Sequence, residues 1–474
     1  MKKLLLAVFS IATTFSLYAQ REVPQERMEQ IYEEVKTPYK YGLAVAPADN
    51  YHKIDCPTVF RQGDKWLMTY VVYNGKGGTD GRGYETWIAE SDNLLEWRTL
   101  GRVLSYRDGK WDCNQRGGFP ALPDMEWGGS YELQTYKGRH WMTYIGGEGT
   151  GYEAVKAPLY VGLAWTKGDI STAHEWESMD KPILSIHDKD AQWWEKLTQY
   201  KSTVYWDKDK TLGAPFVMYY NAGGRHPETD LKGERVGIAL SKDMKTWKRY
   251  SGNPVFAHEA DGTITGDAHI QKMGDVYVMF YFSAFEPSRK YKAFNTFAAS
   301  YDLVNWTDWK GADLIIPSKN YDELFAHKSY VVKHDGVVYH FYCAVNNAEQ
   351  RGIAIATSKS MGRSAVRFPV PESKNRRQIM TLNEGWKTWI TEATHLKGNF
   401  MMPAKTVNIP HNWDDYYGYR QLTHGNLHGT AMYVKDFTAD VKSGKRYFLR
   451  FEGVGTYATI TVNGKNFGRY PAPH

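Results

Sequence analysis

Cysteines, basic runs and long hydrophobic segments are all scarce in this sequence of 474 residues, which argues against disulfides, a nucleic-acid partner and a membrane span in turn. The 3 cysteines, Cys56, Cys113 and Cys343, are odd in number and lack the spacing of metal ligands. We therefore expect mostly buried thiols in a protein that does not depend on disulfides. The net charge of +6 is spread along the chain without a basic run, which argues against a nucleic-acid partner.

The one strongly apolar stretch lies at the start of the chain. Residues 1–19 read MKKLLLAVFSIATTFSLYA, with two lysines, an apolar core and small residues before Gln20. This is the pattern of a secretory signal peptide cleaved after Ala19, and its apolar part is too short for a membrane span. Because Gln20 is not a cysteine, a lipoprotein anchor is not expected. The sequence predicts a periplasmic or extracellular protein without membrane insertion; the alternative is an ordinary buried N-terminal helix.

A hairpin signature recurs five times along the chain. Each copy has a tight turn and then a run rich in aromatic and β-branched residues, as expected for a hairpin and its second strand. The copies read GDKWLMTYVVY from Gly63, KGRHWMTYIGG from Lys137, APFVMYYNA from Ala214, GDVYVMFYFSA from Gly274 and DGVVYHFYCAV from Asp335.

A second signature follows each hairpin. An apolar run leads into a Ser/Asp/Lys turn and then a tryptophan that opens a further strand, as in GIALSKDMKTW ending at Trp247. The fifth copy, IAIATSKSM, matches this pattern only in part. Four strands in each of five units, roughly 60 to 75 residues apart, predict an all-β chain with a five-bladed β-propeller over residues 42–368. An irregular β-sandwich is the alternative, but it would not repeat the same paired signature five times.

The flanks of the propeller have a different character. Residues 20–41 are polar with one helical stretch, which we expect to lie against the outside of the propeller. A charged linker at 369–375 leads to residues 376–474, where alternating strands and an Asn463-Gly464 turn predict a partial antiparallel β-sandwich of jelly-roll type. The last strand pattern ends in what looks like the middle of a domain, so a truncated product is expected.

Candidate functional residues lie on the innermost strand of each predicted blade. Side chains at one end of these strands converge around the central channel of a propeller. Unpaired buried charge is costly in a structural core, whereas it suits an active site, where neighbouring carboxyls acquire different pKa values. The candidates, in chain order, are Asp55, Glu132, Lys201, Asp267, His269, His327 and Lys328.

Each candidate also has a structural interpretation. Asp55 and Asp267 could be turn residues, and Glu132 could face solvent, with Asp124 and Glu126 as its rivals. The two histidines and Lys328 could be satisfied polar residues of the channel, and Lys201 a structural or substrate-binding cation. Aromatic residues, at 15% of the chain, suit both blade packing and sugar binding, so Trp193, Trp194 and Tyr200 could stack on a sugar or simply pack.

Residues from Tyr51 to Phe368 resemble the five-bladed propeller glycosidases of glycoside hydrolase families 43, 32, 117 and 130. In family 43 the general base precedes a proline-containing first inner strand, and Asp55 in IDCPTVF resembles it. Glu132 in SYELQTYKG is similar to the carboxylate that tunes the acid. The general acid of that family is a glutamate opening the third inner strand, where this chain has Lys201 in YKSTVYW.

The resemblance therefore leaves the acid to Asp267 or, as in family 117, to a histidine such as His269 or His327. The residues predicted to bind the substrate, from their own positions in the sequence, are Lys201, His269, His327, Lys328 and Trp194. The sequence identifies no metal ligand and no particular cofactor, and a structural calcium ion in the central channel is compatible with a propeller.

The second resemblance covers residues Arg376 to His474. LNEGWKTW, VNIPHNWDD, MYVKDF and RFEGVGTYATITVNGKNFGRY resemble the N-terminal sugar-binding sandwich of glycoside hydrolase family 2, of the β-galactosidase type, in the order of that family. The catalytic glutamates of that family lie in a later barrel, so this segment is expected to have no chemistry of its own.

Together the residues and the resemblances predict an exported, inverting glycoside hydrolase that cleaves a terminal sugar from a plant or algal polysaccharide. Asp55 would be the base, Asp267 the acid and Glu132 the modulator. Two alternatives remain: a non-catalytic carbohydrate-binding propeller attached to a family 2 enzyme, and a glycoside phosphorylase like those of family 130, which needs a cationic cluster for phosphate.

Overall fold

The structure, a computed structural model, describes residues 22–75, 81–154, 157–370, 379–393, 403–413, 429–441, 446–455 and 457–471. The predicted signal peptide and residues 371–375 of the predicted linker lie outside the described residues. The chain forms two compact units, Met1–Glu372 and Ser373–His474. None of the helices described is both long and apolar enough to cross a membrane.

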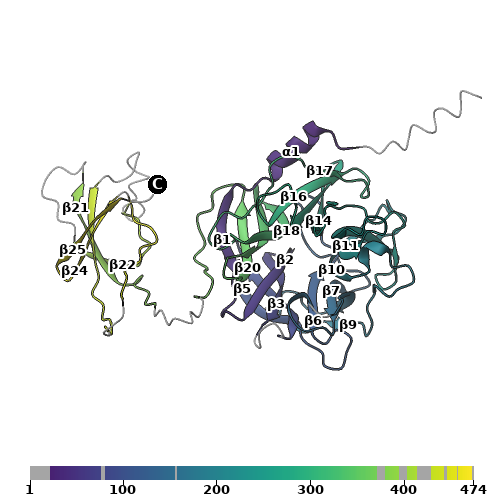
Figure 1. The fold of residues 1–474 in the computed structure, drawn as a ribbon, viewed down its shortest axis with the longest axis horizontal. Coiled ribbons are helices and arrows are strands. Elements are labelled where there is room, and N and C mark those ends of the chain that lie inside the picture. Colours follow the sequence, from purple (N-terminus) through teal and green to yellow (C-terminus); the bar gives the residue numbers. More distant parts are fainter. Residues whose placement is uncertain are drawn as a thin grey trace, which may run out of the picture. The chain divides into compact units, whose positions relative to one another are not determined.

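The first unit is a five-bladed β-propeller, as predicted (Figure 1). The first strand of each blade contacts the first strand of a neighbouring blade or, between blades one and two, the second and third strands. The first strands are β2 (His52–Gln62), β6 (Gln115–Pro120), β10 (Thr198–Trp206), β14 (Ile264–Met273) and β18 (Phe325–His334). The second strands are β3 (Lys65–Asn74), β7 (His140–Gly147), β11 (Phe216–Arg225), β15 (Val276–Ala284) and β19 (Val337–Val345).

The outer half of each blade holds the remaining strands. The third strands are β4 (Gly83–Ser91), β8 (Tyr160–Thr166), β12 (Lys232–Ser241), β16 (Ala293–Ser300) and β20 (Arg351–Thr357). The fourth strands are β5 (Arg98–Leu104), β9 (Glu177–Ser178), β13 (Trp247–Arg249), β17 (Thr307–Asp308) and, for blade five, β1 (Tyr39–Val45). All neighbouring strands within a blade are antiparallel.

The Ser/Asp turn of the second signature has a repeated hydrogen-bond geometry. In blade three, Ser241 Oγ accepts the backbone N–H groups of Asp243 and Met244, and Trp247 Nε1 donates to the Met244 carbonyl. Met244 has a φ of 69°, and Leu94 of blade one and Leu303 of blade four have the same left-handed conformation. Each of these residues is buried, so the apolar side chain anchors a turn whose backbone groups are already paired.

The propeller closes with a strand from the N-terminus. β1 pairs with β20 of blade five, from Tyr39 opposite Thr357 to Val45 opposite Ile353. The sequence placed residues 20–41 in an extension outside the propeller, but Tyr39 to Tyr41 belong to this last strand. Because that strand comes from the opposite end of the unit, hydrogen bonds between the two ends complete the ring.

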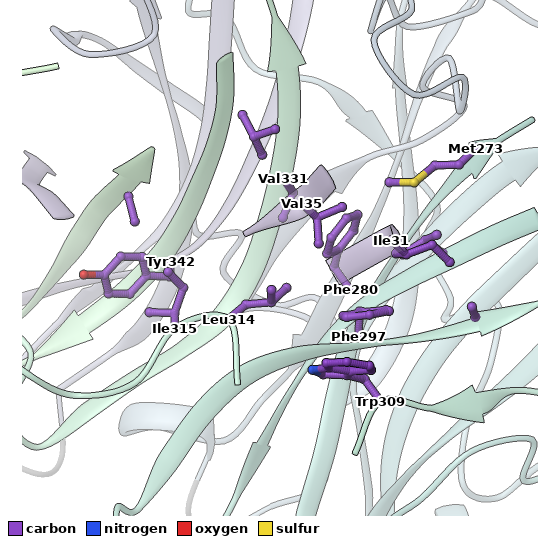
Figure 2. Close-up of a cluster of buried hydrophobic side chains, with 14 of the residues drawn as sticks. Ile31, Val35, Met273, Phe280, Phe297, Trp309, Leu314, Ile315, Val331 and Tyr342 are labelled. Atoms are coloured by element: carbon purple, nitrogen blue, oxygen red, sulfur yellow. The ribbon is translucent and has the colours of Figure 1, made fainter. Parts of the chain in front are cut away.

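Helix α1 (Gln25–Val35) lies on the outside of the propeller, as the sequence predicted. Its apolar face, including Ile31 and Val35, packs on side chains of blades four and five (Figure 2). Phe297 and Trp309 stack there at 5.5 Å between ring centroids, and Tyr32 of the helix also stacks on Trp309, at 5.1 Å. The helix thus covers apolar surface that the outer strands leave exposed.

Blade two departs from the sequence prediction. Its first strand ends at Pro120, and β7 begins only at His140. The intervening segment forms isolated bridges to the far ends of other first strands, such as Glu132 to Arg61 of β2. Six residues of extended strand, roughly 20 Å, separate Arg61 from Asp55 on β2. Glu132 therefore does not lie on an inner strand; it is exposed at the opposite end of the channel from Asp55.

In the second unit the described residues form two sheets. β21 (Trp386–Ala393) lies between β22 (Lys405–Val407) and β23 (Gly429–Val434), and β24 (Tyr457–Val462) pairs with β25 (Lys465–Pro471). The β24–β25 turn has Asn463 at φ 49° and Gly464 at φ 79°, the two left-handed residues of a type I′ turn that the Asn-Gly pair predicted. The assignment of this unit to a family 2 sandwich stays a prediction.

Candidate active site

Four of the five first strands carry a β-bulge at the same level. In β2, β10, β14 and β18 two residues face one on the second strand, at Cys56-Pro57, Tyr200-Lys201, Asp267-Ala268 and Lys328-Ser329. Cys56, Asp267 and Lys328 have φ values of 50°, 58° and 61°, in the left-handed region that side chains other than glycine rarely adopt. Such bulges redirect side chains, and strain of this kind concentrates at functional sites.

The bulges bring charged side chains together, and we call this group the central charged cluster. It consists of Asp55, Glu153, Lys201, Glu234, Asp267, Lys328 and Arg351. Of the residues predicted from the sequence, the structure places Asp55, Lys201, Asp267 and Lys328 in this cluster.

Asp55 is an ionised carboxylate enclosed by donors. Its Oδ1 accepts the Cys56 N–H at 2.9 Å, and its Oδ2 accepts from Lys328 Nζ at 2.8 Å and from the Tyr152 hydroxyl. Arg351 Nη1 lies 3.5 Å from the same oxygen. Burial alone would raise the pKa of Asp55, but Lys328 and Arg351 outweigh it and hold the pKa well below its usual range.

Glu153 is the more accessible carboxylate of the cluster. It lies in the short 3-10 segment Tyr152–Ala154, with a φ of 57°, in the connection between β7 and β8. Its Oε1 accepts from Lys328 Nζ at 3.2 Å, and 37% of its side chain is exposed, against 0% for Asp55. Lys328 thus bridges one enclosed and one accessible carboxylate.

Glu234, the third residue of β12, has the opposite electrostatics to Asp55. Burial, reinforced by the negative charge of Glu153, raises its pKa to about 8, although Asn221 donates to its Oε2 at 3.1 Å. The side chain of Asn221 also accepts the Asp267 N–H at 3.3 Å. Gly266 makes room for it, because a Cβ there would lie 2.6 Å from Asn221 Nδ2. Glu234 is therefore a neutral carboxylic acid at neutral pH.

Asp267 and Lys201 face each other from neighbouring first strands. Asp267 Oδ2 lies 3.5 Å from Lys201 Nζ, and both side chains are almost fully buried. Burial raises the pKa of Asp267, opposed by Lys201 and Lys328. Asp267 is therefore a second buried carboxyl with a raised pKa in the same cluster as Glu234.

Three other predicted residues have different surroundings. His269 is buried between blades four and five, where it stacks on Tyr330 at 3.8 Å and its Nδ1 accepts the Val331 N–H. Trp194 is fully buried in a core cluster and packs on Tyr220, so the prediction that it is a sugar platform was wrong. His327 borders the central charged cluster; its Nδ1 lies 3.2 Å from the Cys343 carbonyl, and burial lowers its pKa to about 3.

Sequence reasoning missed Glu153, Glu234 and Arg351. Glu234 and Arg351 each stand at or near the start of an apolar third strand, in GERVGIALS and RGIAIATS. A charged residue at the start of such an apolar run could have identified both as candidate site residues. Glu153 has none, because it lies in a connection outside any repeat.

Asp55, His327 and Cys343 offer ligand atoms that all lie within 4.8 Å of one another. This group suits a cation poorly, because the Asp55 carboxylate already binds Lys328 and Arg351 and burial raises the pKa of the Cys343 thiol. It also holds one carboxylate only, whereas calcium takes six to eight oxygen ligands. Cys56 and Cys343 are buried and Cys113 is partly exposed, and all 3 are free thiols.

A propeller with a neutral carboxylic acid and an ionised carboxylate near one another at its centre has the groups that glycoside hydrolysis requires. The chain is 96% identical to a solved structure described as a complex of BT0996 with RGII, which matches 74% of this chain over 100% of its own length with a TM-score of 0.74. It is 95% identical to another described as "Glycoside hydrolase", with the same coverage and TM-score. This chain therefore belongs to the glycoside hydrolases, and its substrate is a carbohydrate.

A more distant match is a thermostable family-43 glycoside hydrolase, at 15% identity and a TM-score of 0.45 over 70% of this chain and 99% of that one. No protein-family model and no curated protein matches the chain.

Proposed function

We propose that the propeller hydrolyses the bond to a terminal sugar of a plant polysaccharide of the RGII type, with Glu234 as general acid and Glu153 as its carboxylate partner. The observation that carries this proposal is the contrast between the two glutamates: burial and Glu153 raise the pKa of Glu234 to about 8, while Glu153 is accessible and ion-paired. A carboxyl with a raised pKa beside a second, accessible carboxylate provides the acid and the base that glycosidases use.

Glu234 has the properties of the acid. A protonated carboxyl can donate to the glycosidic oxygen as the bond to the leaving group breaks. Asp267, whose pKa is also raised, is the other candidate for this role, but it faces Lys201 at 3.5 Å and only 4% of its side chain is exposed. The hydrogen bond from Asn221 to Oε2 fixes the orientation of Glu234.

Glu153 fits the base better than Asp55, the residue expected from the sequence. Asp55 accepts from Cys56, Tyr152 and Lys328 and pairs with Arg351, and its lowered pKa makes it a weak proton acceptor. We assign it the positioning of Lys328 and Tyr152. Glu132, exposed at the other end of the channel, has no part in this proposal. Lys328 holds Glu153 in place through their ion pair, and Glu153 takes a proton from water in an inverting reaction.

The phosphorylase alternative needs cations that are available to phosphate. Lys328 is bound to Asp55 and Glu153, Arg351 pairs with Asp55, and Lys201 pairs with Asp267. These cations are already neutralised by carboxylates, which favours water over phosphate as the acceptor. We further propose that the protein is exported to the periplasm or beyond, on the pattern of residues 1–19.

The test compares Glu234→Gln with wild type on two kinds of substrate. An oligosaccharide prepared from RGII needs protonation of its leaving group, whereas a nitrophenyl glycoside of the sugar released from it does not. Loss of a general acid costs roughly a hundred- to ten-thousand-fold, so turnover of the oligosaccharide should fall by that factor while the nitrophenyl glycoside is largely spared. NMR of the first product formed reports its anomeric configuration and hence inversion or retention.

Glu132→Gln is the matched control, because it makes the same change to an exposed glutamate at the other end of the channel. If Glu234→Gln loses the same factor in turnover on both substrates, or if it turns over the oligosaccharide at the wild-type rate, Glu234 is not the general acid. Absence of any turnover by the wild-type protein on these substrates would refute the proposed substrate.

A further inference from the structure

An exposed aromatic pair borders the central charged cluster. Phe285 lies in the turn between β15 and β16 with 49% of its surface exposed, and its ring meets Phe325 edge to face at 6.0 Å between centroids. Phe325 begins β18, two residues before His327, so the two side chains lie on the same side of the strand. Their rings are 5.5 Å apart, and His327 is in turn next to Lys328.

The pair lies at the same end of the propeller as the charged residues. Ala284, the last residue of β15, pairs with Ile264 at the start of β14, and Asp267 follows three residues later. Phe325 likewise pairs with Val345, close to Arg351 at the start of β20. The rings are therefore continuous with the cluster along two neighbouring blades.

The backbone holds Phe285 in an unfavourable conformation. Its φ is 58°, which for a bulky residue is a true outlier, and its N–H donates to the Lys292 carbonyl at 2.8 Å, closing the loop 285–292. Lys292 Nζ lies over the Phe325 ring at 5.7 Å and covers it. The strain is not offset by burial of the Phe285 ring, which stays half exposed; strain of this kind is found at ligand sites.

We propose that Phe285, supported by Phe325, is a platform for the sugar ring next to the one that is released. The apolar C–H face of a pyranose ring packs on an aromatic ring, and a site of this kind combines such apolar surface with a few polar groups that fix orientation. This inference rests on the proposed function for the reaction that the site performs. Sugar binding by Phe285, however, is tested by a measurement that needs no turnover.

Two variants separate the ring from the fold. Phe285→Ala removes the ring and keeps the strained backbone, whereas Phe285→Gly removes the ring and relieves the strain, so the glycine variant should melt at the higher temperature of the two. Tyr39→Ala is the control, since Tyr39 is also 49% exposed but lies on the outermost strand β1. The RGII oligosaccharide and a nitrophenyl monoglycoside are the substrates, and titration of the oligosaccharide into Glu234→Gln, with and without Phe285→Ala, gives Kd.

We expect both Phe285 variants to raise the KM for the oligosaccharide by roughly ten-fold more than the KM for the monoglycoside. The Kd for the oligosaccharide in the Glu234→Gln background should rise by a similar factor, and Tyr39→Ala should change neither. Equal effects on both substrates would overturn the platform while leaving the proposed reaction intact. If Phe285→Ala weakens oligosaccharide binding but even the wild-type protein turns over neither substrate, the platform is supported and the proposed reaction is refuted.

Discussion

The raised pKa of Glu234 makes the stability of the propeller depend on pH in a defined direction. In the unfolded chain this carboxyl has a pKa near 4.5, and in the folded protein burial and Glu153 raise it to about 8. The folded state therefore holds a proton that the unfolded state has lost between these two values. The stability associated with this proton is complete below pH 4.5 and is lost as the pH rises through about 8.

Replacement of Glu234 by glutamine removes this dependence, because the amide is neutral at every pH. Each tenfold change in the acid dissociation constant is worth about 1.4 kcal/mol, so a shift from 4.5 to about 8 sets a ceiling of about 5 kcal/mol. Partial exposure of the side chain and its hydrogen bond with Asn221 lower the real value. Relative to wild type, Glu234→Gln should gain stability as the pH rises from about 5 to about 8, and the difference should level off above that.

Thermal unfolding at a series of pH values measures this effect. At roughly 2 °C per kcal/mol for a unit of this size, the gap in Tm between variant and wild type should widen by several degrees, to about 10 °C at most, between about pH 5 and about pH 9. Glu132→Gln should leave the pH dependence of Tm unchanged. A gap in Tm that stays constant with pH, or that narrows as the pH rises, would refute the assignment of Glu234 as a neutral acid.

Two further outcomes follow from the contacts of predicted residues. Asp55→Asn leaves Lys328 and Arg351 without their buried counter-ion, so it should abolish turnover and cost about 3 to 5 kcal/mol of stability. A turnover assay and denaturant unfolding measure these two effects. Full activity with an unchanged unfolding midpoint would contradict the positioning role. Trp194→Ala should destabilise the propeller by about 3 to 5 kcal/mol while the folded protein binds the oligosaccharide as before; a weaker Kd with unchanged stability would restore Trp194 as a sugar contact.

The repeats decided the architecture. Five hairpins at similar spacing, each followed by a second apolar run, indicate blades of four strands, and strand periodicity then identifies the first strand of most blades. In a propeller, a residue near the start of a first strand lies close to the central channel, whatever the exact arrangement of the blades. For this reason the sequence could identify four candidates correctly: Asp55, Lys201, Asp267 and Lys328. Blade two, where a long segment separates β6 from β7, broke this rule and placed Glu132 wrongly.

Only the tertiary structure decided the chemistry. The bulges at Cys56, Asp267 and Lys328 depend on the exact register between the two strands of each hairpin, and no pattern in the sequence predicts that register. Glu153 comes from a connection without periodicity. The pKa of Glu234 depends on burial and on the charge of Glu153, 81 positions away by their numbers in the chain. A sequence records which ionisable groups exist, but their pKa values depend on the distances and the burial that the folded chain creates.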